Sequence, residues 1–146
     1  MTSSKRNAYQ GKRYIAIVLD LLLVTLFAVI GRAQHGEALD VASVAMTAWP
    51  FLAAAALGHT SLAVLRLEWF RVWPAGVSLW AFTVVVGMLL RLTTGETAQL
   101  AFVIVASIVL AVFLLLPRLL LGRRTKAERA ELRAERAALD AADGLA

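Results

Sequence analysis

Four long runs of apolar side chains constrain this chain more than any other feature of its sequence. They cover residues 14–31, 41–65, 73–91 and 97–121. A helix rises about 1.5 Å per residue, so about 20 apolar residues cross the roughly 30 Å hydrocarbon core of a bilayer. We therefore expect an all-α integral membrane bundle of four transmembrane helices. The composition agrees, because 60% of the residues are hydrophobic and only 17% are charged, where soluble domains average about 25% charged.

The sequence also excludes several kinds of chemistry. The chain has no cysteine, so disulfides, thiolate nucleophiles and thiolate metal sites are ruled out. Its two histidines, His35 and His59, are too few for a His-rich metal site within one chain. No nucleotide-binding loop, zinc-protease motif or serine-hydrolase motif occurs. We expect no metal, no other cofactor and no nucleic-acid partner, and an enzyme is the less favoured class.

The residues within and around the apolar runs predict where the spans begin, bend and end. The first run contains Asp20 and is followed by no small-residue cleavage site, so we expect an uncleaved span and not a signal peptide. The second run is longer than a bilayer requires, so it should tilt or end near Gly58, and Pro50 should bend it. The third should begin at Trp73-Pro74, since proline is tolerated in a first helical turn. The connections are short, so consecutive helices should be antiparallel neighbours.

The basic residues predict the orientation. Thirteen of the 15 lysines and arginines lie before the first run, between the second and third, or at the end of the fourth and beyond it. Only Arg32 and Arg91 lie in the other two connections. Because cytoplasmic loops carry the excess of basic residues, both termini should be cytoplasmic, in a multi-pass protein of the cytoplasmic membrane.

The chain divides into three parts: a basic leader at 1–13, the transmembrane domain at 14–121 and a charged tail at 122–146. The tail is rich in Ala, Glu and Arg, which favours a helix. One interpretation of it is a solvated, frayed cytoplasmic helix. A second, compatible one is that its basic residues bind anionic lipid at the inner headgroups.

Asp20 is the first candidate functional residue, because an acid within a span is costly and commonly functional. Counting along the spans places His59 at about the same depth and Arg118 slightly shallower, within reach of Asp20. These three residues form the predicted inner cluster. It is either a titratable group that relays protons or binds a polar ligand, or a structural contact that fixes the helix register.

A second polar group is predicted at the outer side, from Arg32, His35, Thr47 and Arg91. The pattern R-x-x-x-G-E occurs at Arg32 and again at Arg91, which indicates either duplicated hairpins or two tight turns with the same need for glycine. As a site, the outer cluster would attract anions. As structure, its arginines would be interfacial anchors paired with nearby acids.

Aromatic and small side chains suggest packing roles. Trp69, Phe70 and Trp73 crowd the inner end of the third run and are typical of an interfacial aromatic belt. Ala54 and Gly58, four residues apart, offer a smooth face for close helix approach.

Several motifs together carry a family resemblance: Asp20 in the first run, Gly31-Arg32-x-x-His35 at its end, Thr47-x-x-Pro50-Phe51, Trp73-Pro74-x-Gly76 and Gly87-x-x-x-Arg91. Over roughly residues 15–116 the chain resembles the prokaryotic membrane family catalogued as domain of unknown function 3054. The resemblance implies a small four-helix membrane protein and names no reaction.

Three function classes remain open from the sequence. The first is a small transport or permeation protein, expected to be a homo-oligomer because one four-helix unit leaves little room for a pathway. The second is a non-catalytic scaffold or interaction subunit. The third is a membrane-embedded enzyme on a lipid-like substrate, which would need Asp20 and the outer cluster in one pocket. A water-filled cavity at Asp20 would favour the first class, and a dry bundle the second.

Overall fold

The computed structural model describes residues 3–69, 71–95 and 99–121, and residues 133–134, 136–137 and 140–141 of the tail. Its elements are α1 (Ser3–Gln34), α2 (Val41–Val64), a short π-helical turn η1 (Val72–Gly76), α3 (Val77–Thr93) and α4 (Leu100–Leu121). Within the described residues, four helices are long and apolar enough to span a membrane: Arg13–Gln34, Val41–Val64, Val72–Thr93 and Leu100–Leu120. The predicted all-α class with four candidate spans is confirmed.

The first two spans lie close to the predicted runs. The candidate span of α1 is Arg13–Gln34, against a predicted 14–31, and the helix itself begins at Ser3, within the predicted leader. Of the two alternatives for the second run, an end near Gly58 is wrong, because α2 continues to Val64, one residue short of the predicted run; the tilt stays a prediction. The third span begins as expected, since Trp73 is extended, at φ −116° and ψ 133°, and the helical backbone follows it. The predicted start of the fourth span at Thr97, and most of the predicted tail helix, lie outside the described residues.

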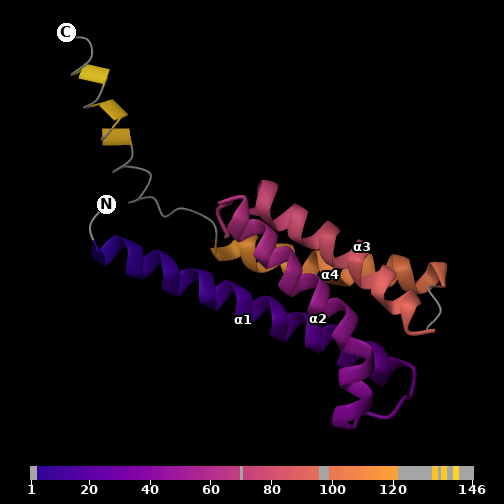
Figure 1. Cartoon of the computed structure of the whole chain (residues 1–146). Coiled ribbons are helices and arrows are strands. Elements are labelled where there is room, and N and C mark those ends of the chain that lie inside the picture. Colours follow the sequence, from indigo (N-terminus) through magenta and orange to yellow (C-terminus); the bar gives the residue numbers. More distant parts are fainter. Residues whose placement is uncertain are drawn as a thin grey trace.

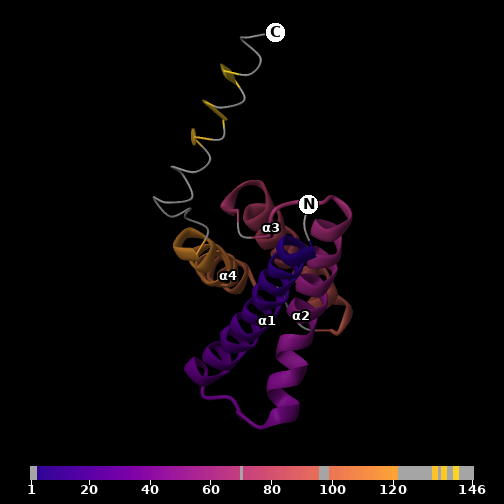
Figure 2. The ribbon, with the colours of Figure 1, turned by 90° about the vertical axis from the view of Figure 1, so that its left-hand side faces the viewer.

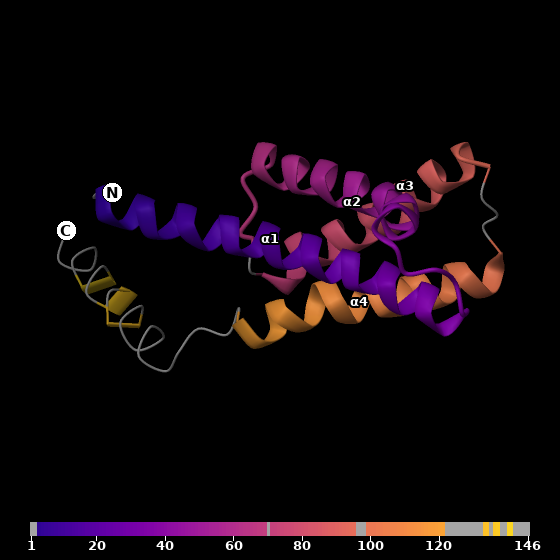
Figure 3. The same ribbon diagram turned by 90° about the horizontal axis from the view of Figure 1, so that it is seen from below.

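The helices form a closed ring of antiparallel neighbours. Helix α1 packs on α2, α2 on α3, α3 on α4, and α4 returns to α1. Figure 1 shows the N-terminus of α1 and the C-terminus of α4 at the same end of the bundle, with the α1–α2 turn, the end of α3 and the start of α4 at the other. We call the first the termini end and the second the turn end. Figure 3 shows α1 extending past the other helices at the termini end.

The core consists of stripes of buried side chains that repeat about every four residues on each helix, as expected for one face of an α-helix. The main cluster joins all four helices, and a smaller one lies at the termini end, where α1, α2 and α3 meet the segment that links α2 to α3. The main cluster contains Val24, Phe27, Phe51, Ala55, Val84, Met88, Ala106, Leu110 and Leu114. The smaller contains Ala16, Leu62, Trp69, Ala75 and Leu79.

Helix α2 is bent. In Figure 3 its first part is seen almost end-on while the rest lies across the view, and Figure 2 shows α1 and α2 diverging toward the turn end. Pro50 lies inside this helix and is buried, and a proline removes a backbone hydrogen bond and bends a helix. Beside the bend, an open apolar groove lies between α1 and α2. It is lined by Val18, Leu21, Leu22, Thr25, Leu52 and Ala56.

Candidate functional site

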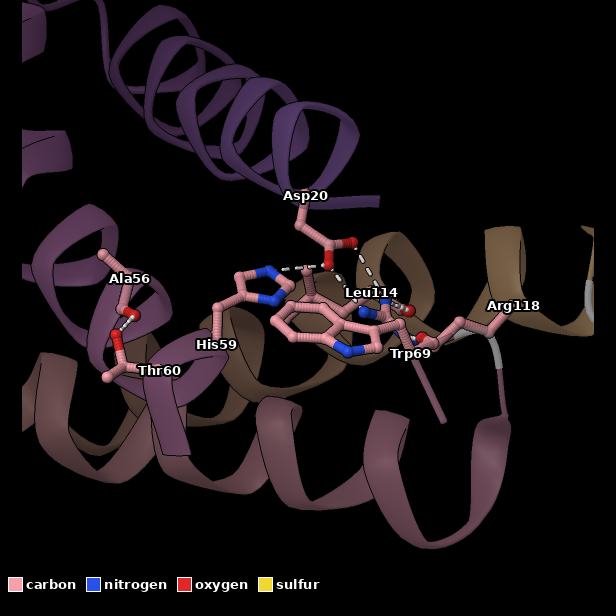
Figure 4. Close-up of polar contacts among 7 residues, drawn as sticks. All are labelled: Asp20, Ala56, His59, Thr60, Trp69, Leu114 and Arg118. Carbon is pink, nitrogen blue, oxygen red and sulfur yellow. Dashed lines mark hydrogen bonds and ion pairs between the residues drawn. The ribbon is translucent and has the colours of Figure 1, made fainter. Parts of the chain in front are cut away.

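The predicted inner cluster forms at the termini end, from three different helices. Asp20 comes from α1, His59 from α2 and Arg118 from α4, and Figure 4 shows their side chains converging. Each lies one helical turn from a core residue of its own helix: Asp20 between Ala16 and Val24, His59 after Ala55, and Arg118 after Leu114. The same periodicity that builds the core therefore directs these polar side chains inward.

Asp20 and Arg118 make a two-pronged ion pair. Nη1 of Arg118 donates to Oδ1 of Asp20 at 2.9 Å, and Nη2 donates to Oδ2 at 2.6 Å. The side chains are 1% and 3% exposed, respectively. Such fork-shaped contacts are among the strongest hydrogen bonds in proteins, and they compensate for the loss of water around two buried charges. The prediction that Asp20 has a partner on a neighbouring span is confirmed.

Backbone carbonyls satisfy further donors of Arg118. Nη1 donates to the carbonyl of Leu114 at 2.5 Å, and Nε donates to the carbonyl of Trp69 at 3.2 Å. Gly76 makes room for this side chain, since a Cβ at that position would lie 2.7 Å from Cδ of Arg118. Arg118 therefore links α4 to α1 and to the segment that joins α2 to α3.

His59 is the second partner of Asp20. Its Nε2 lies 3.0 Å from Oδ2 of Asp20, the oxygen that also accepts from Arg118. The contact is short, but neither imidazole nitrogen has a well-aligned hydrogen bond to a described residue, and both are buried. One carboxylate oxygen is thus shared between a guanidinium and an imidazole, while Nδ1 has no such partner within the described part of the chain.

Trp69 completes the cluster, and the sequence interpretation of it was wrong. Its ring stacks on that of His59, with centroids 5.1 Å apart and planes 4° from parallel, and it is only 5% exposed. The predicted aromatic belt does not include it, because the segment after α2 folds the indole into the bundle. Trp73 is 73% exposed, as a belt residue would be, and Phe70 lies outside the described residues. The guanidinium carbon of Arg13 lies 5.0 Å from the centre of the Trp69 ring.

Arg32 and Thr47 of the predicted outer cluster do meet at the turn end. Nη1 of Arg32 donates to Oγ1 of Thr47 at 2.9 Å and also lies 2.9 Å from Oε2 of Glu37. Its Nε donates to the carbonyl of Ala38 at 2.8 Å. Arg32 therefore ties the first turn to both helices of its hairpin. It pairs with its own loop acid, as the anchor interpretation expects, and it also turns toward Thr47.

The two other residues of the outer cluster, His35 and Arg91, have different surroundings. His35 is exposed in the first turn. The guanidinium carbon of Arg91 lies 4.4 Å from the ring centre of Phe102 on α4, a cation–π contact. The two turns with the repeated pattern have the same backbone conformation at their glycines, since Gly36 and Gly95 have positive φ angles of +66° and +79°. Glycine adopts such angles without strain, which accounts for the repeated glycine by turn geometry alone.

The chemistry available at the termini end is acid–base and charge binding. Asp20 and Arg118 bring a carboxylate and a guanidinium together, and His59 places an imidazole beside them. Among the described residues there is no group of three or more His, Asp or Glu side chains able to hold a metal ion. The site is therefore a buried charge cluster that joins three helices.

The fold and this cluster define a class: a small multi-pass membrane protein with an ionisable group inside its helix bundle. The chain belongs to the family described as "Protein of unknown function (DUF3054)", whose model matches residues 17–121. Comparisons with curated proteins and with solved structures gave no match. The resemblance read from the sequence motifs is confirmed, and the matched region contains every member of the inner and outer clusters.

Proposed function

We propose that this protein is a small transport or permeation protein of the cytoplasmic membrane, and that Asp20, His59 and Arg118 form its polar binding centre. The observation that supports this is the carboxylate of Asp20, 1% exposed, held between a guanidinium and an imidazole from two other helices. Ionisable side chains inside a membrane are rare and expensive, and they commonly mark the path of an ion or a polar substrate.

The cluster couples binding to movement through the charge of Asp20. Three helices are tied together through one negative charge, so a cation or proton that neutralises Asp20 removes the electrostatic tie to Arg118 and His59 together. Helix α4 is the helix that this would release most readily. Only 17% of its most apolar segment is buried within the bundle, against 28% to 33% for the other three spans.

The remaining parts of the proposal concern the surroundings of the bundle. Both termini face the cytoplasm, supported by thirteen of 15 basic residues on that side. The basic tail contacts anionic lipid. A second copy of the chain packs against the exposed apolar face of α4 and so widens the pathway. At the opposite membrane face, Arg32, His35, Thr47 and Arg91 attract anions to an outer mouth.

A second candidate function is a non-catalytic scaffold or interaction subunit. The observation in its favour is that four N–H groups of Arg118 already have acceptors: both oxygens of Asp20 and the carbonyls of Leu114 and Trp69. Such a nearly saturated cluster suits a permanent lock. The enzyme alternative has less support, since Asp20 and Arg32 are twelve residues apart on α1, about 18 Å along the helix axis.

Flux assays in liposomes separate these candidates. The purified full chain is reconstituted and tested with a panel of monovalent ions, protons and small anions, as wild type and as Asp20→Asn. Transport predicts flux of at least one solute in the wild type and its loss in Asp20→Asn. The matched control is Glu68→Gln, an acid that is 55% exposed and pairs with Arg71 in the segment between α2 and α3. Absence of flux for every solute, in vesicles with correctly folded protein, would favour the scaffold.

A further inference from the structure

The contacts of His59 bear on which of its nitrogens carries the hydrogen. Nε2 lies 3.0 Å from a carboxylate oxygen without being aligned for a hydrogen bond, and we assign the hydrogen to it, because a lone pair there would repel the carboxylate. In the neutral imidazole Nδ1 then holds a lone pair. This nitrogen is buried and has no hydrogen-bond partner among the described residues. A buried acceptor without a partner is uncommon and requires an explanation.

We propose that His59 is a proton-binding switch: a proton taken up at Nδ1 makes the imidazole a cation that competes with Arg118 for Asp20 and loosens α4 from α1. The step forms one N–H bond at Nδ1 with a proton from solution, and Arg118 keeps its own charge throughout. The inference rests on the proposed function, because transport is the activity that this switch would control.

The competition follows from the shared oxygen. Oδ2 of Asp20 lies 2.6 Å from Nη2 of Arg118 and 3.0 Å from Nε2 of His59. With a neutral imidazole, Asp20 and Arg118 balance as one negative and one positive charge. With a protonated imidazole, the same carboxylate faces two cations, so each ion pair is weakened by repulsion between the cations. Arg118 has a long, flexible side chain near the end of α4 and is the partner able to move toward water.

The other charged group near His59 acts on both steps of the switch. On α1, Arg13 approaches the Trp69 ring, on which His59 stacks; its positive charge opposes proton uptake by the imidazole and, once the proton is bound, adds to the repulsion between cations. The η1 and α3 residues of the termini-end core, Ala75 and Leu79, are apolar. Glu68 and Arg71 in the linking segment pair with each other at the surface, 3.4 Å apart. Asp20 is therefore the carboxylate on which the switch depends.

Trp69 provides a direct optical test. A protonated imidazole quenches the fluorescence of an indole stacked on it, whereas a neutral one does so weakly. Acidifying the reconstituted protein from about pH 8 to about pH 5, the range in which histidines commonly titrate, should reduce the Trp69 emission. The loss should be reversible and absent in His59→Gln and in Trp69→Phe. A nitrogen NMR titration of histidine-labelled protein needs no change at the site, and His35→Gln identifies the His59 signal.

Distance measurements test the movement. The chain has no cysteine, so spin labels attach only at introduced sites, here Tyr14→Cys on α1 and Leu120→Cys on α4, both exposed positions near the termini end. The distance between them should lengthen on acidification in the wild-type background and stay constant with His59→Gln. The control pair is Ile30→Cys with Leu100→Cys, on the same helices at the turn end, which should not change.

Each result decides the matter. A His59 signal that stays neutral over the whole range, or a distance change that persists in His59→Gln, would overturn the switch. The proposed function can fail independently of the switch. Flux in a protein whose His59 never titrates would support transport and overturn the switch. A His59 that titrates in a protein without any flux would support the switch and overturn transport.

Discussion

The Asp20–Arg118 pair is the most expensive feature of this molecule at the scale of single residues. Removing two charges from water costs several kcal/mol for each ion, and their attraction returns this only when the hydrogen bonds are good. Here the contacts are two-pronged and two backbone carbonyls take further donors. We therefore expect the protein to lose less stability when both charges are removed than when only one is removed.

This gives the first prediction. Arg118→Ala should destabilise the protein by about 3–5 kcal/mol, because it leaves Asp20 charged and buried without its main partner. The double variant Asp20→Leu with Arg118→Met should recover most of that loss. Thermal unfolding in detergent measures both. Arg71→Ala is the control, since Arg71 is 61% exposed and pairs only at the surface, where such a contact contributes about 1 kcal/mol or less.

Sequence reasoning found three of the four side chains at this site and missed the fourth. Asp20, His59 and Arg118 were predictable because a helix has a fixed rise, so counting residues along antiparallel spans gives their depth. Trp69 was not, because its position depends on the chain path after α2. There Arg66 takes a left-handed backbone, with φ of 53°, and turns the chain back. Hydropathy carries no such information; the available signal was a tryptophan ten residues after a membrane histidine.

At the scale of elements, two glycines allow α2 and α3 to approach closely. A Cβ at Gly58 would lie 2.7 Å from Cδ1 of Leu79, and one at Gly87 would lie 2.5 Å from the ring of Phe51. The small face at Gly58 was predicted from its spacing to Ala54. It serves this interface and does not end the helix, because a helical glycine adjacent to another helix permits packing that no larger residue allows.

The second prediction tests this interface. Gly87→Ala should destabilise the protein by about 1–3 kcal/mol, since Phe51 is fully buried and has little room to move. The control is Gly31→Ala, a helical glycine with nothing within 4 Å of its Cβ position, which should be neutral or stabilise by up to about 1 kcal/mol. Unfolding in detergent compares the two. Equal effects at both sites would refute the close-packing argument.

The third prediction concerns the first turn of α2, where Asp40 is the N-cap and its Oδ1 accepts from the backbone N–H of Ser43 at 3.0 Å. Hydrogen bonds from the side chain and then the backbone of Ser43 lower the pKa of Asp40 below its usual 3.8. The charged cap therefore stabilises the helix above pH 3.8, and this contribution is lost as the pH falls through the lowered pKa.

Carbon NMR of the Asp40 carboxyl measures that midpoint. It should lie below 3.8 in the wild type and rise toward 3.8 in Ser43→Ala, because the larger of the two contributions is removed. Ser107→Ala is the control, since that hydroxyl donates to the carbonyl of Val103 in α4. An unchanged midpoint in Ser43→Ala would show that the Ser43 side chain does not lower the pKa of Asp40 and would contradict this prediction.

At the scale of the whole molecule, hydropathy was enough to predict the number of spans, and the short connections between them predicted that consecutive helices are antiparallel neighbours. The outer cluster was less predictable. A turn as short as the one between α1 and α2 brings Arg32 to Thr47 whatever its detailed path. Arg91 has an aromatic ring from the next helix within reach, and its contact with Phe102 competes with any more distant target. Side-chain competition of this kind is decided by packing and leaves no pattern in the sequence.

The last prediction is the sidedness of the whole bundle. Figure 1 shows α1 beginning and α4 ending at the same end, which is also the end where α2 connects to α3. In the sequence, thirteen of the 15 basic residues lie before the first predicted span, between the second and third, or at the end of the fourth and beyond it. Because basic segments are retained in the cytoplasm, cysteines introduced at Ser4 and Thr125 should resist a membrane-impermeant thiol reagent applied to intact cells, and one at Gln34 should react. Permeabilised cells serve as the control, since all three sites should then label. Labelling of Ser4→Cys and Thr125→Cys in intact cells, with Gln34→Cys protected, would reverse the orientation and assign the outer mouth to the cytoplasmic side.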